Sequence, residues 1–164
     1  MMSSNNLEGS LPFSIGLLQH LRMIELASMP GLSGALPLSL FTIVTLRRLC
    51  ICRCEIAGTI PSQIGDLVHL EELQLFGNKI GGAVPDSLGK LVNLRLLSLG
   101  EYTGGNNFAP APLPSCIAKL KKLEALFMAN CNVRGPLPAW IGELTGKACY
   151  LFLSSLSRYS LFTR

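Results

Sequence analysis

The sequence predicts an α/β repeat solenoid, with a parallel β-sheet on one side and short helical or 3-10 return segments on the other. Two observations support this fold class. A Gly-x-Leu-Pro-like block recurs about every 24 residues, and an L-x-x-L-x-L pattern lies between successive blocks. One such unit cannot bury its apolar face alone, but units stacked side by side bury a continuous core.

Six prolines at nearly constant spacing mark the return blocks. They are Pro12, Pro37, Pro61, Pro85, Pro114 and Pro138. Five of the blocks begin with glycine, and the block at Ala111 keeps every feature except the glycine. Two apolar positions follow each proline at a fixed offset, as Ile64 and Leu67 follow Pro61. We expect each block to turn the chain back toward the next strand.

The L-x-x-L-x-L sets begin near Leu21, Leu46, Leu70, Leu94 and Leu123. The last two apolar positions of each set alternate with variable residues, and this period of two indicates a short strand with one buried face. We therefore predict a partial repeat at 1–20, repeats over 21–146 and an out-of-phase tail at 147–164. In the tail, Lys147 falls where an apolar residue is due.

The unit from Leu70 to Val92 carries the most complete motif. It contains Asn78, Ile80, Gly82, Val84, Pro85, Leu88, Gly89 and Leu91 at the expected offsets. In these positions the chain resembles the plant-type leucine-rich repeat family, over residues 5 to about 146. The resemblance implies a horseshoe or superhelix with a concave parallel sheet and additional short strands near the Gly-x-Leu-Pro block.

The same resemblance implies a role. It points to a fragment of a receptor-like protein or receptor-like kinase ectodomain at the plasma membrane, whose parent protein is membrane-anchored. The expected partner is a protein or peptide ligand.

Two departures from the family pattern concern the residues between strand and return block. The position that the family fills with asparagine holds Asn78 once, Cys54 and Cys131 in two other units, and Tyr102 in the unit after Leu94. A thiol is a weak hydrogen-bond donor, so we expect a weakened ladder of side-chain bonds. The unit beginning at Leu94 is also five residues longer than the 24-residue norm, and 101–112 is predicted to form an irregular loop. This loop is either a structural excursion or a binding loop.

Charge and composition exclude several functions. Residues 1–144 hold 11 Lys or Arg against 10 Asp or Glu, with no basic stripe, so no nucleic-acid partner is predicted. The longest uncharged stretch, Leu26 to Leu46, carries proline and glycine at repeat positions, which argues against a membrane-spanning helix despite a mean hydropathy of +0.42.

Catalytic and metal-binding motifs are not found in the sequence. His20 and His69 occupy equivalent repeat positions, and neither has a catalytic partner at a meaningful spacing. Cys50 and Cys52 are predicted to point outward from one strand, too far apart for an easy disulfide, and without further ligands for a tetrahedral metal site. We predict no enzymatic activity, no catalytic residues, no metal and no cofactor.

In-register stacking would place the outward side chains of the strands in three rows across the concave face. Row one is Met23, Arg48, Glu72, Leu96 and Ala125; row two is Glu25, Cys50, Gln74, Ser98 and Phe127; row three is Ala27, Cys52, Phe76, Gly100 and Ala129. From these rows the candidate ligand-binding residues are Arg48, Glu72, Gln74, Phe76, Leu96, Ser98 and Phe127. The candidate loop residues are Tyr102, Asn106, Asn107 and Phe108. Aromatic residues and methionine are enriched at recognition surfaces, although scattered surface apolar residues are an equally ordinary explanation.

The sequence thus predicts a non-enzymatic protein- or peptide-recognition module that binds through the concave sheet and the 101–112 loop. The alternative is an intracellular, cytoplasmic leucine-rich repeat scaffold for protein–protein interaction. The alternative is favoured by the lack of a leader-like segment at Met1, by the lack of Asn-x-Ser/Thr acceptors and by cysteines expected to be free.

Overall fold

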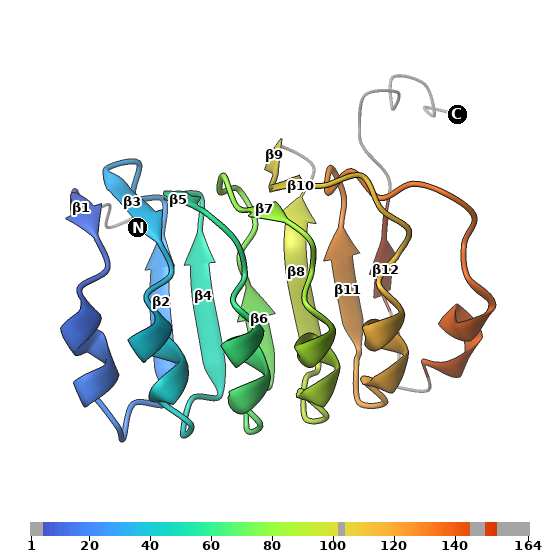
Figure 1. Cartoon of the computed structure of the whole chain (residues 1–164), viewed down its shortest axis with the longest axis horizontal. Helices are drawn as coiled ribbons and strands as arrows, with labels where there is room; N and C mark the ends of the chain where they lie inside the picture. The colour runs from blue at the N-terminus through green and yellow to red at the C-terminus, as the bar shows by residue number, and fades with distance from the viewer. Residues whose placement is uncertain (1–4, 102–103, 145–149, 154–164) are drawn as a thin grey trace, which may run out of the picture.

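The computed structural model describes residues 5–101, 104–144 and 150–153. They form a single stack of repeats, with one large sheet on one side and six short 3-10 helices on the other (Figure 1). The sheet contains β2 (Met23–Ala27), β4 (Arg48–Cys52), β6 (Glu72–Gln74), β8 (Leu96–Glu101), β11 (Ala125–Met128) and β12 (Tyr150–Phe152). Neighbouring strands in this order are parallel, as the repeat predicts.

Short strands also form next to the return blocks, as the resemblance implies. β1 (Gly9–Ser10), β3 (Leu32–Ala35) and β5 (Glu55–Ala57) make a three-stranded parallel sheet, and β7 (Gly81–Gly82) pairs with β10 (Asn107–Phe108). β9 (Gly104–Gly105) lies antiparallel to β8. These small sheets connect successive units on the side of the carboxyl ends of the main strands (Figure 1).

Each repeat proline begins a 3-10 helix. The helices are η1 (Phe13–Leu17), η2 (Leu38–Thr42), η3 (Ser62–Asp66), η4 (Asp86–Lys90), η5 (Ser115–Lys119) and η6 (Ala139–Glu143). Proline is preset near its observed φ of −60° to −74°, and its carbonyl accepts the first helical hydrogen bond, for example from the Ile64 N–H to Pro61 at 3.0 Å. The proline period therefore sets where each return segment starts.

The inward side chains of strands and return segments form one core. Leu49, Leu73, Leu97 and Leu126 are fully buried at equivalent positions of four successive strands. The same cluster includes the apolar residues that follow the repeat prolines, such as Ile64 and Leu67. Because each unit buries its leucines against its neighbours, the core runs the length of the stack.

Asparagine side chains join successive units inside this core. The Asn78 amide donates to the carbonyls of Ile51 (2.7 Å) and Leu75 (2.9 Å), and its oxygen accepts from the Ile56 N–H (3.2 Å). In the long unit the same place is taken by Asn106 and not by Tyr102, which lies outside the described residues. The assignment of Tyr102 to this ladder position is wrong, because four of the five inserted residues come before the asparagine.

Asn106 reproduces the ladder closely. Its amide donates to the carbonyls of Leu99 (2.7 Å) and Leu75 (2.9 Å), and its oxygen accepts from the Ile80 N–H (3.1 Å). Where the position holds a thiol, the contacts are longer or fewer: Cys54 Sγ donates to the Cys52 carbonyl at 3.3 Å and lies 3.9 Å from that of Leu26.

The insertion also changes the strand register. Ser98 pairs with Phe127, but Gly100 pairs with Met128, so one residue of β8 has no counterpart in β11. The sequence analysis instead places Gly100 beside Ala129 in row three. The extra residue forms an irregularity of the kind that a β-bulge produces, and it lets β8 continue into the antiparallel pairing with β9.

The described part of the 147–164 tail contains a strand, β12, although the tail is predicted to be out of phase with the repeat. β12 pairs in parallel with β11, with Leu126 opposite Leu151 and Phe127 opposite Phe152. The segment between Pro138 and β12 is one residue longer than the equivalent segment after Pro114. When that residue is counted as an insertion, Leu151 and Leu153 match Leu126 and Met128 of the preceding unit. The main sheet therefore continues through Phe152; residues 145–149 and 154–164 lie outside the described part of the chain.

Candidate functional site

The register of the main sheet places the outward side chains in rows one and two as predicted. In row two, Cys50 lies opposite Gln74, Gln74 opposite Ser98, and Ser98 opposite Phe127. β12 adds Phe152 to this row, a residue that the sequence analysis does not include. A side-chain period of two, with a register that shifts only beyond Phe127, makes rows one and two of the concave face a regular array.

Five of the candidate residues line one hollow on this face. It has a volume of about 310 Å³ and its lining comprises Gln74, Phe76, Leu96, Ser98, Gly100, Glu101, Phe127, Ala129 and Phe152. Most of these groups are apolar, with the Gln74 amide, Ser98 hydroxyl and Glu101 carboxylate as polar neighbours. The hollow is at the lower end of the size range typical of ligand pockets, which suits one or two side chains of a partner.

Aromatic rings form two walls of this hollow, which we call the concave pocket. Phe127 and Phe152 stack with their ring centroids 4.7 Å apart and their planes at 6°. Phe76, which follows β6, also lines the pocket. The Arg53 guanidinium carbon is 5.7 Å from the centroid of its ring. The rings present flat, rigid apolar surfaces that lose little entropy when a ligand packs on them.

An ion pair bounds the pocket at the carboxyl ends of the strands. Arg53 donates from Nε and a terminal nitrogen to the two Glu101 oxygens, both at 2.9 Å. The ion pair joins Arg53, directly after β4, to Glu101 at the end of β8, and the Arg53 guanidinium lies near the Phe76 ring. Sequence reasoning missed both residues because neither belongs to an outward row; the left-handed backbone of Arg53 (φ 51°) directs it there.

Arg48 and Glu72 lie outside the concave pocket and bind each other. An Arg48 terminal nitrogen lies 2.7 Å from a Glu72 carboxylate oxygen, and both side chains are partly exposed. Gln74 Nε2 makes a longer contact of 3.5 Å with Glu72. The orientation of a ligand by Arg48 and Glu72 stays a prediction. Because the two charges neutralise each other, a ligand would meet an ion pair without net charge there.

The loop residues differ from the expectation of an exposed binding loop. Asn106 and Phe108 are each 4% exposed, and Asn107 is exposed. Asn106 is occupied by the ladder and Phe108 packs in the core, so neither offers its side chain at the surface as a loop contact. Tyr102 lies outside the described residues.

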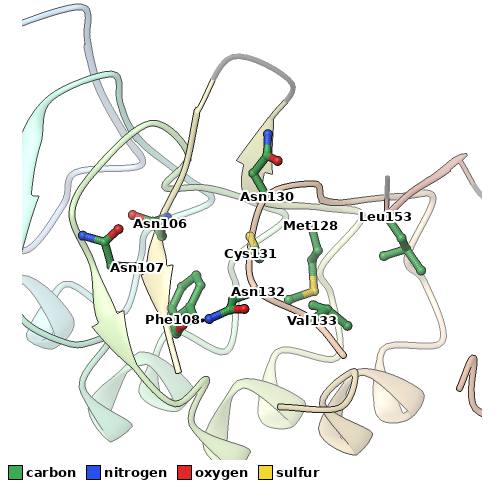
Figure 2. Close-up of a pocket in the computed structure, with 9 residues that line it drawn as sticks. All are labelled: Asn106, Asn107, Phe108, Met128, Asn130, Cys131, Asn132, Val133 and Leu153. Carbon is green, nitrogen blue, oxygen red and sulfur yellow. Dashed lines mark hydrogen bonds between the residues drawn. The ribbon is translucent and has the colours of Figure 1, made fainter. Parts of the chain in front are cut away.

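Figure 2 shows the hollow of about 550 Å³ beside these residues, lined also by Asn130 and Asn132 from the segment after β11. The Asn130 amide donates to the Glu101 carbonyl at 2.9 Å, and the Asn132 amide donates to the Phe108 carbonyl at 3.2 Å. Both asparagines have left-handed backbones, with φ of 56°. These contacts fasten the inserted segment to the next unit and favour the structural excursion over the binding loop.

The five described cysteines are free thiols and are buried. Burial raises the pKa of the Cys54 and Cys116 thiols, and raises that of Cys131 to about 12. The Sγ atoms of Cys50 and Cys52 lie 3.3 Å apart, in contact but not joined by a disulfide. Within the described ranges no cluster of three or more His, Cys, Asp or Glu side chains is arranged to hold a metal ion.

None of the helices in the described ranges has the length and apolar character needed to cross a membrane.

Comparisons with known proteins agree with this architecture. The family model for the Leucine Rich Repeat matches residues 69–91, the unit with the most complete motif. No curated protein matches the sequence significantly.

Solved structures give extensive matches. The ectodomain of the Arabidopsis thaliana receptor kinase GASSHO1/SCHENGEN3, in complex with CASPARIAN STRIP INTEGRITY FACTOR 2, is 31% identical with a TM-score of 0.82, over 92% of this chain and 18% of that one. The Arabidopsis receptor kinase HAESA ectodomain, in complex with an IDA peptide hormone ligand, is 29% identical with a TM-score of 0.79, over 92% of this chain and 29% of that one.

A second HAESA complex, with IDA and the co-receptor SERK1, is 28% identical with a TM-score of 0.71, over 94% of this chain and 34% of that one. The present chain therefore spans about a third or less of the length of these relatives. The repeated unit, the solenoid architecture and these matches together show that the chain is a leucine-rich repeat solenoid, similar to the ectodomains of plant receptor kinases.

Proposed function

We propose that this chain is a protein- or peptide-recognition module of a receptor-like leucine-rich repeat protein, and that it binds through its concave face. One observation carries the proposal: Phe76, Leu96 and Phe127, predicted separately from their row positions, line a single pocket. The pocket suits an apolar side chain of the ligand, with the partly exposed Gln74 amide in its lining to hydrogen-bond the ligand backbone.

The relatives support a cell-surface location. GASSHO1/SCHENGEN3 is a plant membrane receptor kinase, and its ectodomain is in complex with CASPARIAN STRIP INTEGRITY FACTOR 2. HAESA is a receptor kinase in complex with the peptide hormone IDA and, in one structure, also with the co-receptor SERK1. For this chain, receptor membership, membrane anchoring of the parent protein and the concave residues as the binding site are parts of the proposal.

Replacing both Phe76 and Phe127 with serine is expected to weaken ligand binding at least about tenfold, because aromatic anchors in a pocket commonly contribute 1–2 kcal/mol or more each. The probe is a set of peptides selected from a random phage-displayed library on the immobilised chain. The dissociation constants of these peptides are then measured for the unsubstituted chain and for the double variant.

A matched control replaces Val68 and Val92 with serine. Both valines are exposed and lie in equivalent turns away from the concave pocket, so binding should not change. Far-ultraviolet circular dichroism checks that every variant keeps the fold. Peptides that bind the Phe76 and Phe127 double variant as tightly as the parent would refute the concave pocket as the binding site.

The second candidate is an intracellular interaction scaffold, and the described cysteines favour it because all five are free thiols. Thiol titration of the native protein, isolated without reductant and unfolded before labelling, separates the candidates. Six free thiols support the scaffold, and fewer than six support the oxidising environment of the cell surface.

A further inference from the structure

Cys50 and Cys52 stand apart from the other described cysteines. Cys54, Cys116 and Cys131 belong to the apolar core, whereas Cys50 and Cys52 do not contribute to that cluster. Their side chains lie on the concave face of β4, at the row-two and row-three positions beside Gln74 and Phe76. They are 9% and 2% exposed.

The two sulfurs are already in contact. The 3.3 Å Sγ–Sγ distance fits a thiol hydrogen bond, and Cys52 Sγ also lies 3.4 Å from the Gln74 carbonyl oxygen. The hydrogen bond from Cys52 lowers the pKa of the Cys50 thiol below its usual value, and the same contact together with burial raises the pKa of Cys52.

A disulfide is a poor fit for this pair. Residues two apart in a strand have Cα atoms about 6.6 Å apart, at the upper end of the range that disulfides span, and the Cβ atoms must approach to about 3.8 Å. β4 is paired on both sides, with β2 and β6, which resists the bend that closer approach requires. One atom held between the two sulfurs needs no such approach.

We propose that Cys50 and Cys52 form a dithiol site that binds a soft, thiophilic centre through both sulfurs, with trivalent arsenic as the representative ligand. Two thiolates are the ligands that soft centres prefer, whereas a structural zinc site needs four. The described residues supply no third ligand side chain at this place. The two sulfurs border the concave pocket at Gln74 without belonging to its lining, and the proposal does not depend on the function proposed above.

The reaction with phenylarsine oxide is a condensation. Arsenic forms one bond to each sulfur, the two S–H bonds and the As–O double bond break, and the oxygen leaves with both protons as water. Arsenic stays trivalent, so no oxidant or reductant is required.

The test uses the folded, reduced full chain and one equivalent of phenylarsine oxide. Trypsin cuts after Arg48 and Arg53, so the peptide Leu49–Arg53 carries both sulfurs and no other thiol. Mass spectrometry should find one phenylarsenic group on this peptide. The adduct should survive excess 2-mercaptoethanol and be released by 1,2-ethanedithiol, because two linked sulfurs compete far better than separate ones.

Cys50→Ser and Cys52→Ser should each lower the arsenical retained in 2-mercaptoethanol at least about tenfold, since a single thiol loses the chelate advantage. Cys116→Ser removes a buried thiol in the core and is the matched control. This variant should retain the arsenical fully. Arsenic on other cysteine peptides, equal retention by the single variants, or a Leu49–Arg53 peptide that has only lost two hydrogens would overturn the proposal. The tryptic peptide map of the unsubstituted chain shows which cysteines carry the arsenic, so it tests the proposal even if a variant does not fold.

Discussion

Replacing Asn106 with alanine is expected to lower the free energy of unfolding by about 3 kcal/mol, because it leaves two buried backbone groups without partners. The Ile80 N–H loses its acceptor, and the Leu99 carbonyl loses its 2.7 Å donor. The Leu75 carbonyl keeps the amide of Asn78 at 2.9 Å, so the loss is confined to the long unit. Urea denaturation followed by circular dichroism measures the difference.

The adjacent asparagine provides the control. The Asn107 side chain is exposed, and Asn107→Ala should change the free energy of unfolding by less than about 0.5 kcal/mol. Equal effects of the two substitutions would contradict the assignment of Asn106 to the ladder. The pair of variants therefore tests which residue of the inserted segment takes the place that Asn78 has in the preceding unit.

Replacing Gly100 with alanine is expected to destabilise the protein by at least about 2 kcal/mol, because overpacking against fixed backbone forces the chain to move. A Cβ atom at this position would lie 2.0 Å from the Ala129 carbonyl oxygen and 2.5 Å from the Cys131 sulfur. The nearer of these two atoms, the Ala129 carbonyl oxygen, belongs to the backbone, so no side-chain rotation relieves the clash. The measurement is again the free energy of unfolding.

Gly142 in η6 is the matched glycine, since a Cβ atom there meets nothing within 4 Å. Gly142→Ala should leave stability unchanged or raise it by up to about 1 kcal/mol, through the lower entropy of the unfolded chain. A Gly100→Ala protein as stable as the parent would show that β8 and β11 do not approach each other as closely as their register requires.

Much of the candidate site follows from the sequence because it depends on a periodic feature. The L-x-x-L-x-L pattern gives the side-chain direction in every strand, and aligning its leucines from unit to unit gives the register of the strands, even across the long unit that begins at Leu94. Gln74, Leu96, Ser98 and Phe127 could therefore be grouped before any coordinates were known. Arg53, Glu101 and Phe152 could not, because Arg53 owes its direction to a left-handed backbone and the other two lie where the repeat changes length.

The inserted segment shows the limit of counting forward along the chain. Counted forward from Leu94, the ladder position falls on Tyr102; counted back from Pro114 by the spacing of Asn78 from Pro85, it falls on Asn107. The structure places Asn106 there, because four of the five extra residues come before the ladder position and one comes after it. The same applies to the tail, where one extra residue places Leu151 and Leu153 in the repeat.

The sequence by itself determined the parallel sheet, the 3-10 return segments that begin at proline, the inward leucines and the outward rows. Each of these is a local pattern repeated at a fixed period, so hydrophobic burial admits one way of stacking them. Only the tertiary structure decided that Phe127 stacks on Phe152, that Arg53 and Glu101 bound the concave pocket and that Cys50 and Cys52 touch. Those contacts depend on rotamers, on one bulge and on two insertions, and none of these features has a period that can be read from the chain.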